Sequence, residues 1–485
     1  MPLPGGFGRL RPAHSRSGSG GWKRKEETMN ILVVNGSPKG KYSITLQTVR
    51  YWQILYPQHS FTELHAGQRI KALEKDFAPA LEALQKADLI VFSYPVYTFL
   101  APYQLHRFIE LCKQHGVQLA GKYATQLSTS KHFYDITAHG YIRDNCLDLG
   151  LKYIRGLSAD MDDLTLPDGQ RQAREFFEHL LWCVKNDYYE KPLPEAELPP
   201  LVPATVPTAQ QPEKTGDVVV ITDCEPGNAA LHAMLGRFCA VLPYRTRVVN
   251  IREYPFSAGC LGCFNCAVDG KCIHKDGFDE FLRRELQTAQ AMVYAFTVRD
   301  HSMGAAFKLY DDRQFCNGHR TVTMGMPVGY LVSGALSREE NLRTVIEARA
   351  QVGDNFLAGV AGDETETDAS VDRLAASLAY ALRTGYVPPQ NFWGIGGMKI
   401  FRDLIWQMQG MMRADHRFYK AHGQYDFPQK KWPRMLAMYA VGAMLGSPKI
   451  KAKMGNAMND GMLMPYKKVL DAAKAAQDAA GTAER

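Results

Sequence analysis

The chain has 485 residues, a formal net charge of +7 and 46% hydrophobic residues. Its apolar runs all fall short of the roughly eighteen residues that a membrane span needs, and its basic residues do not interleave with aromatic ones on a recognisable module. We therefore expect a globular protein of two or three domains that neither crosses a membrane nor binds nucleic acid.

The two ends of the sequence and its cysteines limit the setting. Residues 1–28 are rich in Gly, Ser and Arg and have no apolar core of a signal peptide, so we expect a disordered tail there and a folded part from Met29. Six of the ten cysteines lie singly in apolar or helical contexts. This pattern favours a reducing compartment, and we expect a cytoplasmic protein.

The first folded segment has the pattern of a phosphate-binding turn. Asn30–Asn35 is an apolar run typical of a buried parallel strand, and helical spacing starts after Thr45. Backbone N–H groups and the hydroxyls of Ser37, Ser43 and Thr45 could surround a phosphate between them. The alternative is an ordinary capped helix.

Two further apolar runs end in polar or aromatic loops. Asp88–Ser93 is followed by Tyr94-Pro95-Val96-Tyr97, and Tyr123–Leu127 is followed by Ser128–Tyr134. Open α/β sheets bind cofactors at the carboxyl ends of their strands. The three loops together predict a cofactor site.

These motifs resemble those of the flavodoxin-like NADPH-dependent FMN reductase and quinone reductase family. The resemblance covers residues 29–186 and rests on Gly36-Ser37-Pro38 with Ser43 and Thr45, on Tyr94–Tyr97, and on Pro102 with Leu105. It implies FMN as cofactor and NAD(P)H as donor, and it identifies no catalytic residue. It assigns Ser37, Lys39, Ser43 and Thr45 to the phosphate, Pro95, Val96 and Tyr97 to the flavin ring, and Ser128, Thr129 and Ser130 to its polar edge.

A proline-rich linker separates this domain from a second one. Seven prolines fall between residues 191 and 212, and such a run resists both helix and strand, so we place a linker at 187–215. Residues 216–387 then repeat the earlier order of strands and helices. The sequence predicts an α/β protein with two tandem flavodoxin-like, doubly wound parallel-sheet domains.

The second domain contains a compact four-cysteine motif. Cys260, Cys263, Cys266 and Cys272 are separated by two, two and five residues, so that four thiolates could wrap one inorganic centre. This half resembles the iron-sulfur flavoproteins, in which such a motif holds a four-iron four-sulfur (4Fe-4S) cluster. A tetrahedral zinc site and free thiols are the alternatives.

The second domain lacks the flavin loops of the first. Its phosphate-loop position, Thr222–Ala229, contains Asp223 and Glu225, which would repel a phosphate if ionised, and its ring loop reads Thr297-Val298-Arg299. We therefore expect FMN in the first domain alone. The two domains would pair like subunits of the iron-sulfur flavoproteins, with this FMN facing Cys260–Cys272.

Residues 388–485 form a predicted helical, Met-rich extension. Eleven of the nineteen methionines lie between 398 and 464, with apolar residues at helical spacing. The helices could pack over the sheets, cover the flavin, or offer a basic surface to a membrane or an acidic carrier. Asp415, His416, Tyr419, His422 and Tyr425 are candidate proton donors.

The sequence thus predicts an FMN-dependent oxidoreductase, with FMN in the first domain and a 4Fe-4S cluster in the second. It would move electrons between NAD(P)H or a ferredoxin-like carrier and a small acceptor, and it could form homo-oligomers. One alternative is a simple NAD(P)H-dependent FMN or quinone reductase without a cluster. The other is a non-enzymatic electron-relay subunit.

Overall fold

The computed structural model describes residues 28–192, 197–208, 213–447, 449 and 457–483. The predicted tail lies outside the described residues except for Thr28, and the proline-rich linker is described only in part. Contacts divide the chain into two units, residues 1–417 and 418–485, each of which is described by itself.

The first domain is built on a wholly parallel sheet with the order β2-β1-β3-β4-β5, in which β6 also pairs with β4. The central strands β1 and β3 are largely apolar runs because helices cover both of their faces. The strands are β1 (Asn30–Asn35), β2 (Ser60–Leu64), β3 (Leu89–Pro95), β4 (Tyr123–Ser130), β5 (Lys152–Tyr153) and β6 (Leu157–Asp160).

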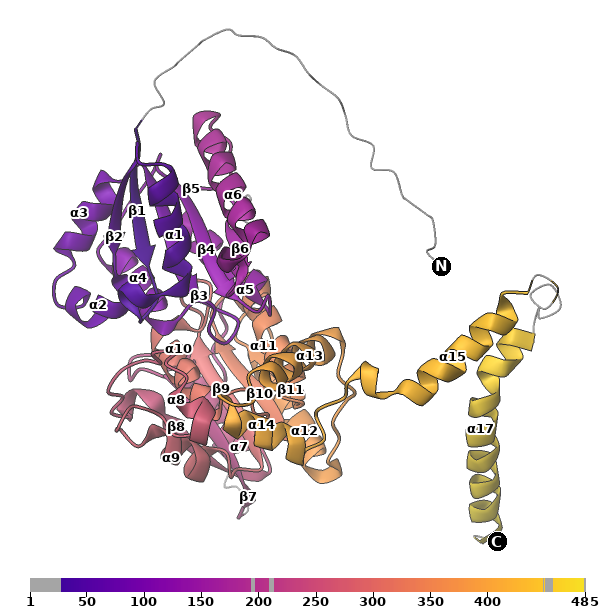
Figure 1. Cartoon of the computed structure of the whole chain (residues 1–485). Coiled ribbons are helices and arrows are strands. Elements are labelled where there is room, and N and C mark those ends of the chain that lie inside the picture. Colours follow the sequence, from indigo (N-terminus) through magenta and orange to yellow (C-terminus); the bar gives the residue numbers. More distant parts are fainter. Residues whose placement is uncertain (1–27, 193–196, 209–212, 448, 450–456, 484–485) are drawn as a thin grey trace. The chain divides into compact units, whose positions relative to one another are not determined.

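Two groups of helices cover this sheet. One face packs on α1 (Ile44–Leu55) and α6 (Pro167–Lys185). The opposite face packs on α2 (Ala66–Leu73), α3 (Ala78–Lys86), α4 (Tyr103–Gln114) and α5 (Asp135–Asp148). The result is the three-layer arrangement of a doubly wound fold (Figure 1).

The second domain repeats this connectivity. Its parallel sheet has the order β11-β10-β9-β7-β8, which is the first-domain order when its strands are counted from β7. The strands are β7 (Thr215–Thr222), β8 (Tyr244–Asn250), β9 (Ala291–Thr297), β10 (Pro327–Ser333) and β11 (Phe356–Gly362). The predicted fold class of two tandem flavodoxin-like domains is confirmed.

The helices of the second domain also fall into two groups. α7 (Ala229–Val241) and α12 (Thr367–Thr384) cover one face, while α10 (Gly304–Arg313) and α11 (Glu340–Val352) cover the other. The short α8 (Asn265–Asp269) and α9 (Phe278–Phe281) follow the first cysteines. After α9 the chain continues directly into a π-helical turn over Leu282–Leu286.

The two domains share one hydrophobic core. A single cluster of buried apolar residues runs from Leu32 in β1 to Ala350 in α11. Within it, α4 packs on α10 and α5 packs on α11. The carboxyl-terminal loops of the first sheet are thereby held against the second domain.

The carboxyl-terminal extension is helical, as predicted. Its helices are α13 (Phe392–Gln407), α14 (Arg413–Ala421), α15 (Trp432–Leu445) and α17 (Ala457–Ala483), and α13 packs on α11. Among the described residues, none of the helices combines the length and hydropathy that a membrane span requires.

Candidate functional site

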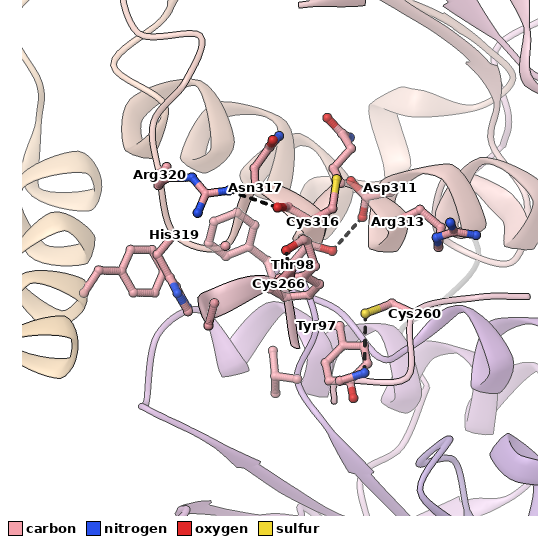
Figure 2. Close-up of a pocket in the computed structure, with 18 of the residues that line it drawn as sticks. Tyr97, Thr98, Cys260, Cys266, Asp311, Arg313, Cys316, Asn317, His319 and Arg320 are labelled. Atoms are coloured by element: carbon pink, nitrogen blue, oxygen red, sulfur yellow. Dashed lines mark hydrogen bonds between the residues drawn. The ribbon is translucent and has the colours of Figure 1, made fainter. Parts of the chain in front are cut away.

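One cavity of about 760 Å³ collects the chemically distinctive parts of residues 1–417. Loops of the first domain, the cysteine segment, the 313–323 segment of the second domain and the end of α13 all contribute side chains (Figure 2). The predicted site residues that line it are Ser37, Lys39, Ser43, Thr45, Pro95, Val96, Tyr97, Thr129, Ser130, Cys260, Cys263, Cys266 and Cys272. Ser128 does not line it; its hydroxyl lies 2.8 Å from His139 Nε2 instead.

The predicted phosphate loop forms a compact turn before α1. Gly40, with a positive φ of 55°, donates its N–H to Ser37 O. The Ser43 hydroxyl caps α1 by accepting from Leu46 N at 3.4 Å. The first N–H groups of a helix lack partners within the helix and attract anions. The cap made by Ser43 is therefore compatible with the predicted role of this turn in binding a phosphate.

The ring loop between β3 and α4 is strained and buried. Tyr97 and Leu100 close a turn with two backbone hydrogen bonds of 2.8 and 3.1 Å. Within that turn, Thr98 and Phe99 have positive φ values of 45° and 72°, a region that side chains other than glycine seldom occupy. Burial raises the pKa of Tyr97, so its phenol keeps its proton.

Buried charges of the second domain hold this strained turn. Lys308 in α10 donates to Tyr97 O at 3.0 Å and to Thr98 Oγ1 at 2.7 Å, and it pairs with Asp311 and Asp312. Arg349 donates to Thr98 O and to Asp311 Oδ2. Burial raises the pKa of Asp312 to about 6, an effect that Lys308 partly offsets. The ring loop is thus fixed from across the domain interface.

The cysteine segment meets both loops of the first domain. Phe264 follows Cys263 in the sequence, and Lys39 Nζ of the first domain lies 5.6 Å from its ring centroid. Gln104 in α4 donates to Cys260 O at 3.2 Å. Gly262 has a positive φ of 59°, and a Cβ there would lie 1.8 Å from Tyr97 Oη. The structure therefore brings together the two halves of the predicted redox site.

A buried ion pair anchors the start of the cysteine segment. Arg313, 1% exposed, donates to both carboxylate oxygens of Asp276 at 2.7 and 2.8 Å and to Ala258 O at 2.8 Å. Its guanidinium also lies over the ring of Phe278. This bidentate pair fixes the backbone two residues before Cys260.

All four cysteines border the cavity. Burial raises the pKa of Cys266 to about 11, and its Sγ–H donates to Phe315 O at 3.1 Å. Gly262 N and Asn265 Nδ2 donate to Cys260 Sγ and Cys263 Sγ, as donors around cluster sulfurs do. Within the described ranges, no group of three or more His, Cys, Asp or Glu residues is arranged to hold a metal ion. The donor set suits a cluster, but this side-chain arrangement does not.

The corresponding phosphate-loop position of the second domain is filled by ion pairs. Glu225 pairs with Arg252 at 2.7 Å and with Arg299 at 3.1 Å. Burial raises the pKa of Asp223 to about 6, and Arg252 acts in the opposite direction. These residues lie outside the lining of the cavity.

A polar corner of the cavity was only partly foreseen. Asn317, Arg320 and Asp415 line it, and Asp415 is the member of the predicted proton-donor group that does so. The roles of Thr98, Lys308 and Phe264 were not predicted from the sequence. A Lys followed by acids three and four residues later was the available signal for Lys308, although that spacing is equally typical of an exposed helix.

Comparisons with known proteins agree with the fold. The model of a family described as having a flavodoxin-like fold matches residues 29–159, which confirms the predicted resemblance for the first domain. No curated protein matches the chain.

Three similar solved structures each cover about a third of this chain. A putative quinone reductase from Klebsiella pneumoniae has 15% identity and a TM-score of 0.25, covering 32% of this chain and 84% of its own. An NADH:FMN oxidoreductase in its apo form has 20% identity and a TM-score of 0.29, covering 32% and 89%. An FMN-dependent NADH-azoreductase from Bacillus anthracis in complex with FMN has 14% identity and a TM-score of 0.26, covering 32% and 100%.

Proposed function

We propose that the chain is an FMN-dependent oxidoreductase that passes electrons between NAD(P)H or a ferredoxin-like carrier and a small acceptor. The observation that carries this proposal is the cavity of about 760 Å³, because loops at the carboxyl ends of β1, β3 and β4 line it together. FMN, when bound, accepts an electron pair or hydride and can release electrons singly.

Different residues of the first domain would contact the phosphate, the ring and the ring edge of FMN. The hydroxyls of Ser37, Ser43 and Thr45, the first N–H groups of α1 and the Lys39 ammonium would hold the phosphate. Pro95, Val96 and Tyr97 would form the wall against the ring, and Thr129 and Ser130 would offer hydroxyls at its edge. Because the second domain has ion pairs at its own loop, it would bind no flavin.

An FMN titration tests this assignment. The double variant Ser43→Ala/Thr45→Val should lower FMN affinity at least about tenfold, because it removes two hydroxyl donors from an anion site. Thr48→Val, on α1 but outside the cavity lining, is the matched control and should bind FMN normally. A full equivalent of FMN retained by the double variant would overturn the assignment.

A second candidate function for the cavity is to hold a 4Fe-4S cluster on Cys260, Cys263, Cys266 and Cys272. It is favoured because all four cysteines border the same cavity as the flavin loops. Their side chains would have to turn toward one centre. Iron and sulfide analysis of anaerobically purified protein decides between the cluster, a zinc ion and free thiols; zinc without sulfide would end the cluster hypothesis.

Two further alternatives differ in their predicted activity. A simple FMN or quinone reductase would oxidise NAD(P)H without iron or sulfide, whereas an electron-relay subunit would not oxidise it at all. Nicotinamide oxidation by the purified protein separates them. In the part of the chain that the structure describes, all ten cysteines are unpaired, which supports the proposed reducing, cytoplasmic location.

A further inference from the structure

The polar corner of the cavity contains three buried side chains with unused hydrogen-bonding atoms. Within the described part of the chain, Asn317 Oδ1, Arg320 Nη1 and Asp415 Oδ2 are enclosed and have no hydrogen-bond partner. Asn317 is 8% exposed and Asp415 is fully buried, while the Arg320 side chain is 10% exposed. Buried polar atoms normally have partners, because leaving one unpaired costs free energy.

The backbone fixes this corner. Asp415 Oδ1 accepts from His319 N at 2.9 Å, so its other oxygen is the one left over. Gly318 has a positive φ of 60°, and a Cβ there would lie 2.3 Å from Asp415 Oδ1. Arg320 donates through Nη2 to Cys316 O at 3.0 Å, whereas its Nη1 makes no hydrogen bond and lies 3.6 Å from Asp415 Oδ1. Figure 2 shows Asn317, His319 and Arg320 around the pocket.

The set of unused atoms has a specific complement. It comprises two acceptor oxygens and one donor nitrogen, and Arg320 and Asp415 have opposite charges 3.6 Å apart. A matching ligand therefore needs one acceptor, two donors and no net charge. A primary carboxamide has this composition, since its oxygen accepts and its two N–H groups donate.

Apolar side chains surround the corner. Phe401, Leu404, Met408 and Met412 line the adjoining wall, and the rings of His319 and Phe401 lie 4.7 Å apart. Such a wall suits a flat ring attached to the polar group. We propose that Asn317, Arg320 and Asp415 form a binding site for an aromatic primary carboxamide, either the nicotinamide ring of a dinucleotide or a free aromatic amide. This inference rests on the proposed function only in that a dihydronicotinamide bound here would be the electron donor; binding of an aromatic amide requires no electron transfer.

The test compares nicotinamide with 3-acetylpyridine, in which a methyl group replaces the amide nitrogen. Dissociation constants are measured by ligand-observed NMR with the full chain at pH 8, both loaded with FMN and stripped of it. At this pH Asp415 is ionised, because burial raises its pKa only to about 6. We expect nicotinamide to bind at least about tenfold more tightly, since a site built for N–H donors rejects an analogue without them.

Variants assign the preference to the corner. Asp415→Asn should reduce the preference for nicotinamide, because the amide oxygen would take the bond from His319 N and the unused acceptor would become an NH2 donor. Arg320→Met should weaken both ligands, and Arg320→Lys should restore part of the affinity. Arg299→Met, outside the cavity lining, is the matched control. Thermal melting identifies variants that fail to fold. If Arg320→Met is one of them, the conservative variants Arg320→Lys and Asp415→Asn still test the site, because they change its charge or hydrogen bonding with little change in side-chain volume.

Three outcomes would overturn the inference: equal binding of the two ligands, a preference unchanged in Asp415→Asn, or displacement of FMN by nicotinamide. Competition with NADH distinguishes the sources, because a dinucleotide ligand would displace nicotinamide whereas a free-amide site would not admit it. If the protein prefers nicotinamide to 3-acetylpyridine but fails to bind added FMN, the proposed function is wrong and the carboxamide site is still supported.

Discussion

Lys308 of the second domain donates from Nζ to Thr98 Oγ1 of the first domain at 2.7 Å. Thr98 in turn donates to Asp311 Oδ2 at 2.6 Å. A β-branched residue with φ of 45° is strained, so this hydrogen-bonded pair fixes a conformation that the ring loop would not favour by itself. The conformation of the proposed flavin loop thus depends on α10.

Replacing Thr98 tests this dependence. Thr98→Val removes the hydroxyl and leaves Asp311 without that donor, so the free energy of unfolding should fall by about 1–3 kcal/mol. FMN affinity should also fall, because the ring loop would lose its fixed shape. Thr98→Ser retains the hydroxyl and is the control. Urea denaturation and FMN titration measure the two effects; equal behaviour of the variants would contradict the role given to the hydroxyl.

Removing the cation should have a larger effect. Lys308→Met leaves Asp311 and Asp312 buried with less compensation, so we expect a loss of about 3–5 kcal/mol in the free energy of unfolding. Lys86→Met, at an exposed pair with Glu82, should leave it almost unchanged, because water screens exposed pairs. Adding Asp312→Asn to Lys308→Met should recover part of the loss, because it removes an uncompensated charge.

The contact between Gly262 and Tyr97 can be tested by a matched pair of substitutions. Gly262→Ala places a methyl group 1.8 Å from Tyr97 Oη at a positive φ, so we expect about 1–3 kcal/mol of destabilisation and weaker FMN binding. Gly227→Ala meets no atom within 4 Å and should be nearly neutral. Adding Tyr97→Phe to Gly262→Ala should restore stability in part; a stable, FMN-binding single variant would refute the contact.

A pH-dependent bridge joins the two domains at His301. Burial opposes the charged imidazole, but hydrogen bonds to Asp148 of the first domain and Glu339 of the second outweigh it and raise the pKa of His301 to about 10. Lys113 also pairs with Asp148. Because the folded protein binds this proton more tightly than the unfolded chain does, protonated His301 stabilises the fold. The stabilisation is complete below pH 6.5, the pKa of the unfolded state, and is lost as the pH rises through about 10.

The free energy of unfolding should therefore decrease between pH 6.5 and 10, with a slope of up to about 1.4 kcal/mol per pH unit from this group. His301→Gln should be less stable at pH 6.5 and should have a flatter profile over the same range. Denaturant unfolding at several pH values measures both profiles. Parallel profiles for the two proteins would contradict the assignment to His301.

The sequence was most informative where one pattern excluded the others. Asn30–Asn35 and Asp88–Ser93 are continuous apolar runs, which are typical of buried parallel strands. The first ends in the predicted phosphate-binding loop and the second in an aromatic loop, and this combination predicted the sheet correctly. β11 was missed because its sequence, Phe-Leu-Ala-Gly-Val-Ala-Gly, contains two glycines that favour a loop. β4 extends to Ser130, since pairing with β6 adds residues that looked like loop.

The cross-domain contacts could not be predicted from local pattern. Lys308, Asp311 and Asp312 are typical of a solvated helix face, and their burial arises only because α10 packs on α4. The corner at Asp415 likewise needs Gly318 and Arg320, about a hundred residues earlier in the chain. The domain boundaries at 186, 215 and 387 stay predictions.

The hydrophobic cluster that runs through both domains has an evolutionary consequence. After a duplication, two independent copies could diverge freely, and one could be lost. Here, a change in α10 alters a loop of the other copy, so natural selection acts on both halves together. We expect either half by itself to expose apolar surface that the other half covers here, so that it would need a second subunit to supply the missing face.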